Sequence, residues 1–94
     1  MPASGGRVEV VVYGAPDCHL CDVAKATLEP AAARLGFSLA TVDISGDPEL
    51  EARHRARIPV VEIDGEEAFV YHVSPGLLER RVRAAQSRRL GKAS

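Results

Sequence analysis

The sequence of 94 residues contains no tryptophan, and its aromatic share is only 4%. The hydrophobic core must therefore be aliphatic, built from Val, Leu, Ile and Ala. No run of about 18 apolar residues is present, so the sequence predicts no segment that spans a membrane. The formal net charge is only −1, so we expect no attraction of the whole molecule to nucleic acid.

Positive charge is nevertheless uneven along the chain. The segment 80–92 contains no acidic residue and six basic ones: Arg80, Arg81, Arg83, Arg88, Arg89 and Lys92. We interpret this segment as a solvated helix end, where cations lie near the last carbonyl groups. The alternative is a patch for RNA or an acidic partner, although no aromatic residue is interleaved with these charges.

The beginning of the chain, Met1–Arg7, has no apolar core and therefore does not resemble a secretory signal. We expect a cytoplasmic protein that forms one domain over residues 1–94, with residues 1–6 and about 87–94 flexible. Only two cysteines are present. In a reducing compartment, two close cysteines indicate catalysis or metal binding more than a permanent structural disulfide.

Residue patterns predict an α/β protein with the order β-α-β-α-β-β-α. The first strand, 8–13, is almost continuously apolar, as expected for a strand that is covered on both faces. Pro30 lies inside the first helix and should kink or split it. A right-handed crossover makes the first two strands parallel, and Asp64-Gly65 is a typical turn between antiparallel strands. The other expected elements are strands over 37–44, 60–63 and 66–71, a helix over 48–57 that Asp47 caps, and a helix that begins at Pro75 and frays from Gln86.

Cys18 and Cys21 lie where the first strand gives way to the first helix. Free backbone N–H groups at a helix N-terminus stabilise a thiolate, which is the form of cysteine that attacks disulfides. Cys21 follows one turn later, within reach of the Cys18 sulfur. The spacing predicts that Cys18 attacks the substrate and that Cys21 resolves the mixed disulfide.

Two neighbours modify this dithiol. A protonated His19 would favour the Cys18 thiolate, whereas Asp17 would oppose its ionisation. An equally simple interpretation of His19 is an exposed residue of the first helical turn.

Ile58-Pro59 precedes the third strand. A cis bond there would bring the Ile58 backbone beside the two sulfurs, where a substrate chain pairs with it as an added strand. The alternative is a trans proline that only ends the preceding helix.

Four stretches of this chain resemble the glutaredoxin-like proteins of the thioredoxin superfamily, and most of all the short bacterial-type group. They are the run Tyr13–Cys21 (YGAPDCHLC), Leu28-Glu29-Pro30, Val42-Asp43-Ile44 and Ile58-Pro59-Val60-Val61. The resemblance covers about Val8 to Leu78. It implies a thioredoxin fold with a four-stranded mixed sheet between helices, a cis Pro59 that faces the dithiol, Cys18 as nucleophile and Cys21 as resolving thiol.

The chain departs from that family at three places. His19-Leu20 replaces the usual Pro-Tyr between the cysteines, and Arg57-Ile58-Pro59 replaces Thr-Val-Pro. His72-Val73-Ser74-Pro75-Gly76 stands where glutaredoxins have a Gly-Gly-x-x-Asp segment that holds glutathione. Glutathione is therefore one candidate reductant and not a requirement. Arg57 either contacts an anionic substrate or lies at a solvent-facing helix end.

The sequence thus predicts a small thiol–disulfide oxidoreductase of cell redox homeostasis. We expect Ile58, Pro59 and Arg57 to bind the substrate, with no bound cofactor or metal. The expected partners are a disulfide-containing protein or a small thiol, and a monomer is favoured.

Two alternatives remain open. The first is an iron–sulfur or zinc carrier; zinc would need Cys18, Cys21 and a histidine such as His19 or His54, and two cysteines are only half of a zinc site. The second is a non-catalytic binding module that keeps the thioredoxin fold.

Overall fold

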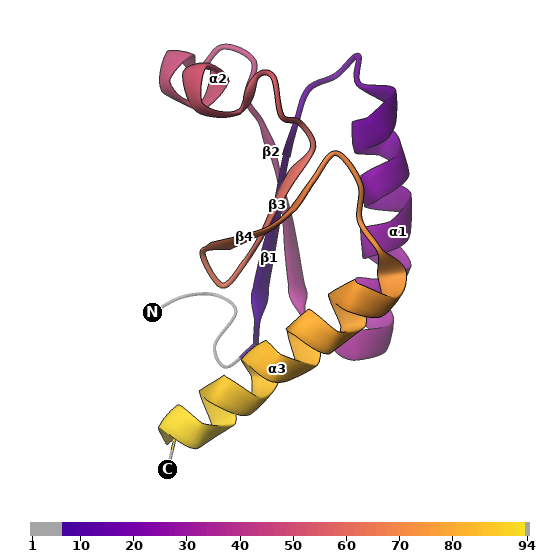
Figure 1. The fold of residues 1–94 in the computed structure, drawn as a ribbon, viewed down its shortest axis with the longest axis vertical. Helices are drawn as coiled ribbons and strands as arrows, with labels where there is room; N and C mark the ends of the chain where they lie inside the picture. The colour runs from indigo at the N-terminus through magenta and orange to yellow at the C-terminus, as the bar shows by residue number, and fades with distance from the viewer. Residues whose placement is uncertain (1–6, 94) are drawn as a thin grey trace.

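The computed structural model describes residues 7–93, with side chains up to Leu90, and its elements follow the predicted order (Figure 1). The lead-in at residues 1–6, predicted to be flexible, lies outside the described residues, as does Ser94. The strands are β1 (Glu9–Gly14), β2 (Ser38–Asp43), β3 (Val60–Ile63) and β4 (Glu66–Val70), and the helices are α1 (His19–Leu35), α2 (Pro48–His54) and α3 (Pro75–Ala93).

The four strands form one mixed sheet in the order β2-β1-β3-β4. β1 runs parallel to β2 and antiparallel to β3, and β3 runs antiparallel to β4. Asp64 and Gly65 join β3 to β4 with φ values of 51° and 85°, the left-handed conformation that a two-residue hairpin turn needs. The predicted sheet and its terminal hairpin are therefore confirmed.

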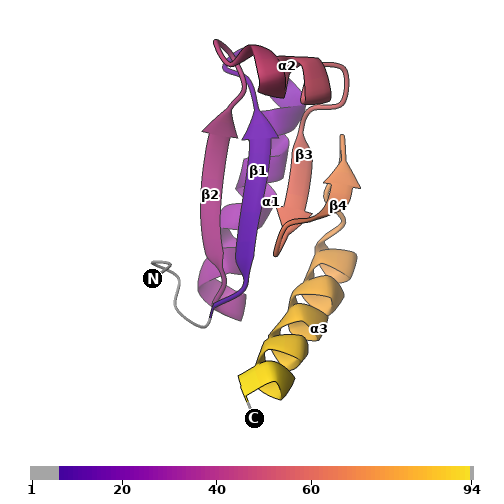
Figure 2. The same ribbon diagram turned by 90° about the vertical axis from the view of Figure 1, so that its left-hand side faces the viewer.

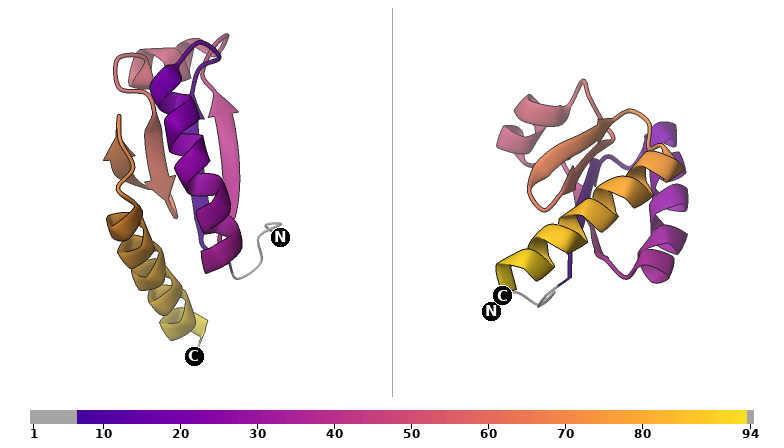
Figure 3. Two further views of the ribbon diagram at one scale, coloured as in Figure 1. Left: turned by 90° about the vertical axis from the view of Figure 1, so that its right-hand side faces the viewer. Right: turned by 60° about the horizontal axis from the view of Figure 1, so that its bottom comes forward.

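Helices α1 and α3 pack on one face of the sheet, and α2 lies on the opposite side near the carboxyl ends of β1 and β2 (Figures 2 and 3). The core between the sheet and the two long helices is almost entirely aliphatic, as the composition predicts. Its fully buried members include Val8, Val10, Val12, Leu28, Val61, Leu78 and Val82.

The expectation that β1 is covered on both faces is met fully on one face and only in part on the other. Val10 and Val12 are fully buried beneath α1 and α3, but Val11 and Tyr13 on the other face are only half-buried. Helix α2 has only seven residues, so it covers one end of that face. There the ring of His54 stacks on Tyr13 with ring centroids 4.6 Å apart.

Pro30 was predicted to kink or split the first helix; α1 continues past it as a single element, so the split does not occur. Pro30 and Ala26, whose carbonyl loses its helical donor, both lie on the exposed side of the helix. Water can therefore satisfy that carbonyl group. Gly36 ends the helix as predicted, with a φ of 81°.

Helix α2 begins as the sequence predicts, because Asp47 Oδ1 accepts the backbone N–H groups of Glu49 and Leu50. It ends at His54, three residues earlier than expected. The residue before a proline avoids helical backbone, so the chain must already be extended at Ile58.

Helix α3 is longer than predicted and remains helical through Ala93. Gln86 Nε2 donates to the carbonyl oxygen of Leu35 at 2.9 Å. Arg89 makes two hydrogen bonds to the Asp64 carboxylate, at 2.7 and 2.9 Å. These tertiary contacts hold turns that the sequence pattern alone leaves free. Neither α3 nor any other helix within residues 7–93 is long and apolar enough to cross a membrane.

Candidate active site

The end of β1 places the dithiol at the carboxyl edge of the sheet. Gly14 is the last residue of β1, and its carbonyl oxygen accepts the backbone N–H of Ile44 at 2.9 Å, just beyond β2. A three-residue loop follows, and Cys18 is the N-cap residue of α1 with extended backbone. Cys18 thus lies where free helical N–H groups point outward, as predicted.

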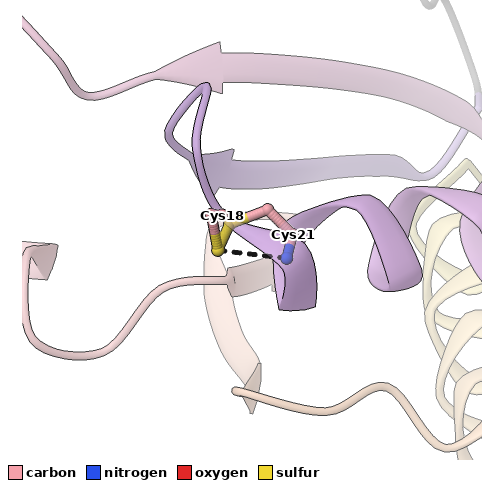
Figure 4. Close-up of a disulfide and its surroundings, with 2 residues drawn as sticks. All are labelled: Cys18 and Cys21. Atoms are coloured by element: carbon pink, nitrogen blue, oxygen red, sulfur yellow. Dashed lines mark hydrogen bonds between the residues drawn. A yellow bond between two sulfur atoms is a disulfide. The ribbon is translucent and has the colours of Figure 1, made fainter.

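Cys18 and Cys21 form a disulfide with 5.2 Å between their Cα atoms (Figure 4). Cys21 is completely buried, whereas Cys18 is half-buried. The backbone N–H of Cys21 donates to Cys18 Sγ at 3.1 Å. The same donor would stabilise a thiolate on Cys18 after reduction.

Gly14 provides the space in which Cys21 lies. A Cβ atom on Gly14 would lie 2.9 Å from Cys21 Sγ, a distance that real Cβ contacts do not show. This role of Gly14 was not predicted from the sequence. A glycine at the end of a strand, just before the dithiol, is itself a signal of close approach.

The Ile58–Pro59 peptide bond is cis, as the family resemblance implies. Tyr13 pairs with Val60 in the antiparallel register of β1 and β3, so the next position along this register sets Pro59 beside Gly14. Gly14 in turn contacts Cys21. Pro59, just before β3, and the buried sulfur of Cys21, in the first turn of α1, therefore both lie beside Gly14 at the same end of the sheet.

Ile58 is half-buried, and its backbone is unpaired. Within residues 7–93 neither its N–H nor its carbonyl group makes a hydrogen bond. An unpaired peptide group next to a dithiol is what an added substrate strand requires.

Arg57 lies in the loop between α2 and β3, and not at a helix end. Its guanidinium forms an ion pair with the carboxylate of Glu67 on β4, and its backbone N–H donates to the His54 carbonyl at 2.8 Å. The charge that was predicted to meet an anionic substrate is already neutralised by Glu67.

Asp17 and His19 flank Cys18 and are both exposed. Neither side chain forms a hydrogen bond or an ion pair within the described part of the chain. Their effect on the Cys18 thiol therefore stays a prediction.

Tyr71, just after β4, is a second residue that the sequence analysis missed. Its hydroxyl donates to the Ala56 carbonyl at 2.6 Å, and its N–H donates to the Pro59 carbonyl at 2.8 Å. Its φ is 71°, a conformation that no pattern in the sequence signals for a tyrosine.

The residues that the structure describes contain no group of three or more His, Cys, Asp or Glu side chains placed to hold a metal ion. The zinc alternative needs a histidine beside the two cysteines. His54 is instead the buried last residue of α2, and its ring stacks on Tyr13 of β1.

Comparison with known proteins places this site in a family. The model of the glutaredoxin-like domain (DUF836) matches residues 9–85, which include the dithiol and Pro59. "Uncharacterized protein Rv0508" of Mycobacterium tuberculosis is 31% identical over 83 residues, which are 83% of this chain and 81% of that protein.

Solved structures agree with this assignment. Protein Ne2328 from Nitrosomonas europaea has a TM-score of 0.70 and 26% identity, over 81% of this chain and 92% of its own. Protein XcR50 from X. campestris has a TM-score of 0.66 and 29% identity, over 80% and 96%. Fasciola hepatica thioredoxin, with a TM-score of 0.59 and 24% identity over 84% and 81%, shares the fold. The chain therefore belongs to the glutaredoxin-like (DUF836) family and has the thioredoxin fold.

Proposed function

We propose that this protein is a thiol–disulfide oxidoreductase in which Cys18 is the nucleophile and Cys21 is the resolving thiol. The observation that carries the proposal is the asymmetry of the pair. Cys18 is half-exposed and accepts an N–H at the helix N-terminus, whereas Cys21 is fully buried behind it. Of the two sulfurs, that of Cys18 is the one open to a substrate, and it is the one with a hydrogen-bond donor among the described residues; this donor stabilises negative charge.

The reaction follows from this placement. In the reduced protein, the Cys18 thiolate attacks one sulfur of a substrate disulfide; the Cys18–substrate bond forms, and the departing sulfur takes up a proton. Cys21 then loses its proton and attacks Cys18 Sγ, which releases the second substrate thiol. Two electrons pass to the substrate, and the protein is left as the Cys18–Cys21 disulfide.

The substrate chain pairs with the free N–H and carbonyl group of Ile58, beside Pro59. Arg57 contacts an anionic group of the substrate only where that group displaces Glu67 from the ion pair. No bound cofactor enters this reaction. An external dithiol or glutathione restores the reduced protein, and the partners are disulfide-containing proteins or small thiols that a cytoplasmic monomer meets.

Single cysteine variants test the division of labour. Cys21→Ser should accumulate a mixed disulfide with a glutathionylated or protein substrate, because the resolving thiol is absent. Cys18→Ser should form no adduct and should not reduce insulin disulfides. Equal trapping by both variants would contradict the assignment. Stoichiometric metal or colour in the purified protein would instead favour the carrier alternative.

The flanking charges are tested through the thiolate of Cys18, which absorbs in the ultraviolet. Asp17→Asn removes a nearby negative charge and should lower the pKa of Cys18. His19→Gln removes a potential positive charge and should raise the pKa of Cys18. Unchanged titrations in both variants would show that the helix N-terminus alone sets the thiolate population.

A further inference from the structure

Tyr71 adopts a backbone conformation that costs free energy. Its φ of 71° lies in the left-handed region, which bulky side chains rarely enter. Such a residue persists only when its surroundings hold it in place, and residues of this kind gather at functional sites. The contacts that hold Tyr71 therefore indicate its purpose.

Two hydrogen bonds hold Tyr71, and both go to the segment that leads into β3. The hydroxyl donates to the Ala56 carbonyl at 2.6 Å, and the backbone N–H donates to the Pro59 carbonyl at 2.8 Å. One residue thus fixes both ends of the four-residue segment 56–59.

The two middle residues of this segment, Arg57 and Ile58, differ in how many hydrogen bonds they make. Arg57 is held through its N–H to His54 and through its guanidinium to Glu67. Ile58 alone within the segment has neither backbone group engaged in a hydrogen bond. Among the described residues, this arrangement leaves the N–H and carbonyl group of Ile58 free directly before Pro59, and it holds the residues on either side.

Packing does not account for this arrangement. Tyr71 is 50% exposed and lies outside the buried core cluster. Burial of its ring therefore offsets little of the cost of its backbone conformation. Part of the compensation is local, because the His72 N–H donates to the Val70 carbonyl at 2.8 Å and closes a three-residue turn around Tyr71. The hydrogen bonds to segment 56–59 are the contacts that join this turn to the rest of the site.

We propose that Tyr71 is a positioning residue, which holds segment 56–59 so that Ile58 presents its N–H and carbonyl group to an extended peptide. The inference rests on the proposed oxidoreductase function and narrows its substrate to disulfides carried on a polypeptide. A small disulfide without peptide groups cannot form hydrogen bonds with the backbone of Ile58, so its binding does not depend on how Tyr71 holds segment 56–59. The half-exposed ring adds an apolar surface beside the bound chain.

The first test compares two substrates in the Tyr71→Phe variant, which keeps the ring and loses the bond to Ala56. Insulin supplies a disulfide on a polypeptide, and bis(2-hydroxyethyl) disulfide supplies one without peptide groups. We expect KM for insulin to rise about fivefold, the value of one ordinary hydrogen bond. The ratio of kcat/KM for insulin to that for the small disulfide should fall by the same factor. Tyr13→Phe is the matched control, because it removes the hydroxyl that donates to Glu62 and should leave this ratio unchanged.

A second variant separates positioning from folding. Tyr71→Gly accepts a positive φ without strain, so its thermal unfolding should shift little, or upward. Its selectivity for insulin should nevertheless fall at least as far as in Tyr71→Phe. A stable protein with lost selectivity is a result that a purely structural role of Tyr71 does not produce.

Two outcomes would overturn the inference. Equal loss of activity on both substrates in Tyr71→Phe would show that Tyr71 has only a general structural role. An unchanged ratio of kcat/KM for insulin to that for the small disulfide, in both Tyr71 variants, would show that Tyr71 does not position Ile58 for a peptide. The wild-type protein separates this inference from the proposed function. If it reduces both substrates, the oxidoreductase assignment stands whatever the variants show; if it reduces neither, the assignment fails and the role of Tyr71 fails with it.

Discussion

Gly14 and Cys21 are in direct contact: a Cβ atom on Gly14 would lie 2.9 Å from Cys21 Sγ and 3.1 Å from Cys21 Cβ. The end of β1 and the first turn of α1 therefore approach more closely than any larger residue would allow. This approach fixes the buried half of the dithiol.

Gly14→Ala should disturb the site directly, because the added methyl group must displace Cys21. We expect a loss of about 1–3 kcal/mol in the free energy of unfolding, typical of overpacking in a core. The displaced sulfur should also close the disulfide less readily. Urea unfolding and a glutathione redox titration measure the two effects.

Gly76→Ala is the matched control. Nothing lies within 4 Å of the position that its Cβ would take, and Gly76 lies in the first turn of α3. Ala is the better helix former, so a gain of about 0.5–1 kcal/mol is expected. Equal behaviour of the two variants would show that the contact with Cys21 is not what restricts Gly14.

His54→Phe should stabilise the protein. His54 is 2% exposed and stacks on Tyr13, and within residues 7–93 neither of its ring nitrogens has a hydrogen-bond partner. A buried polar group left unpaired costs about 1–3 kcal/mol. Phenylalanine keeps the aromatic stack and removes that cost, so the free energy of unfolding should rise in chemical denaturation. A marked loss of stability would mean that water or another group satisfies the imidazole in solution.

Tyr13 should ionise at unusually high pH. Burial raises the pKa of its phenol, and the Glu62 carboxylate, which repels the phenolate and accepts its hydrogen bond, raises it further; Arg53 acts weakly in the opposite direction. The folded protein thus holds this proton more tightly than the unfolded chain. The resulting stability is complete below about pH 10 and is lost as pH rises through the folded pKa.

An ultraviolet titration in the Tyr71→Phe background follows Tyr13 alone, since the chain has only two tyrosines. Adding Glu62→Gln should move the transition toward lower pH. No movement would assign the whole shift to burial.

The ion pair between Asp64 and Arg89 should matter at neutral pH and vanish in acid. Hydrogen bonds from Arg89 hold the pKa of Asp64 below its usual value. The contribution of this ion pair to the stability of the fold is therefore complete above the unfolded pKa of Asp64, about 3.9. It is lost as pH falls through the lower folded pKa of Asp64. Asp64→Asn should lower Tm at pH 7, and the difference from the wild type should shrink at the acid end of the titration.

Glu66→Gln, on the same hairpin, is the control for the hairpin's general charge, because Glu66 is exposed and its side chain makes no hydrogen bond or ion pair in the described residues. It should leave the pH profile of Tm nearly unchanged. A profile that changes as much as that of Asp64→Asn would trace the effect to net charge and not to Arg89.

Local signals predicted much of this fold. Asp47 caps α2, Gly36 ends α1, and Asp64-Gly65 turns the hairpin, each because the residue's own conformational preference decides the local structure. Cys18 and Cys21 were predicted for the same reason. Their spacing in the chain already determines how they meet at the start of a helix.

The features that were missed depend on contacts between distant parts of the chain. Helix α3 extends through Ala93 partly because Gln86 reaches Leu35, 51 positions earlier. The role of Gly14 depends on what packs against it, and the left-handed Tyr71 runs against its own preference. Such features follow from tertiary structure, which no local pattern encodes.

The last turns of α3 lie at the end of the molecule farthest from the start of α1 (Figure 1). The ion pair between Arg89 and Asp64 holds this part of α3 against the β3–β4 hairpin and involves no residue near the sulfurs. A fusion partner, fluorophore or surface tether appended beyond α3 would therefore leave the dithiol open to its substrates, so single-molecule or immobilised assays can use this end as their point of attachment.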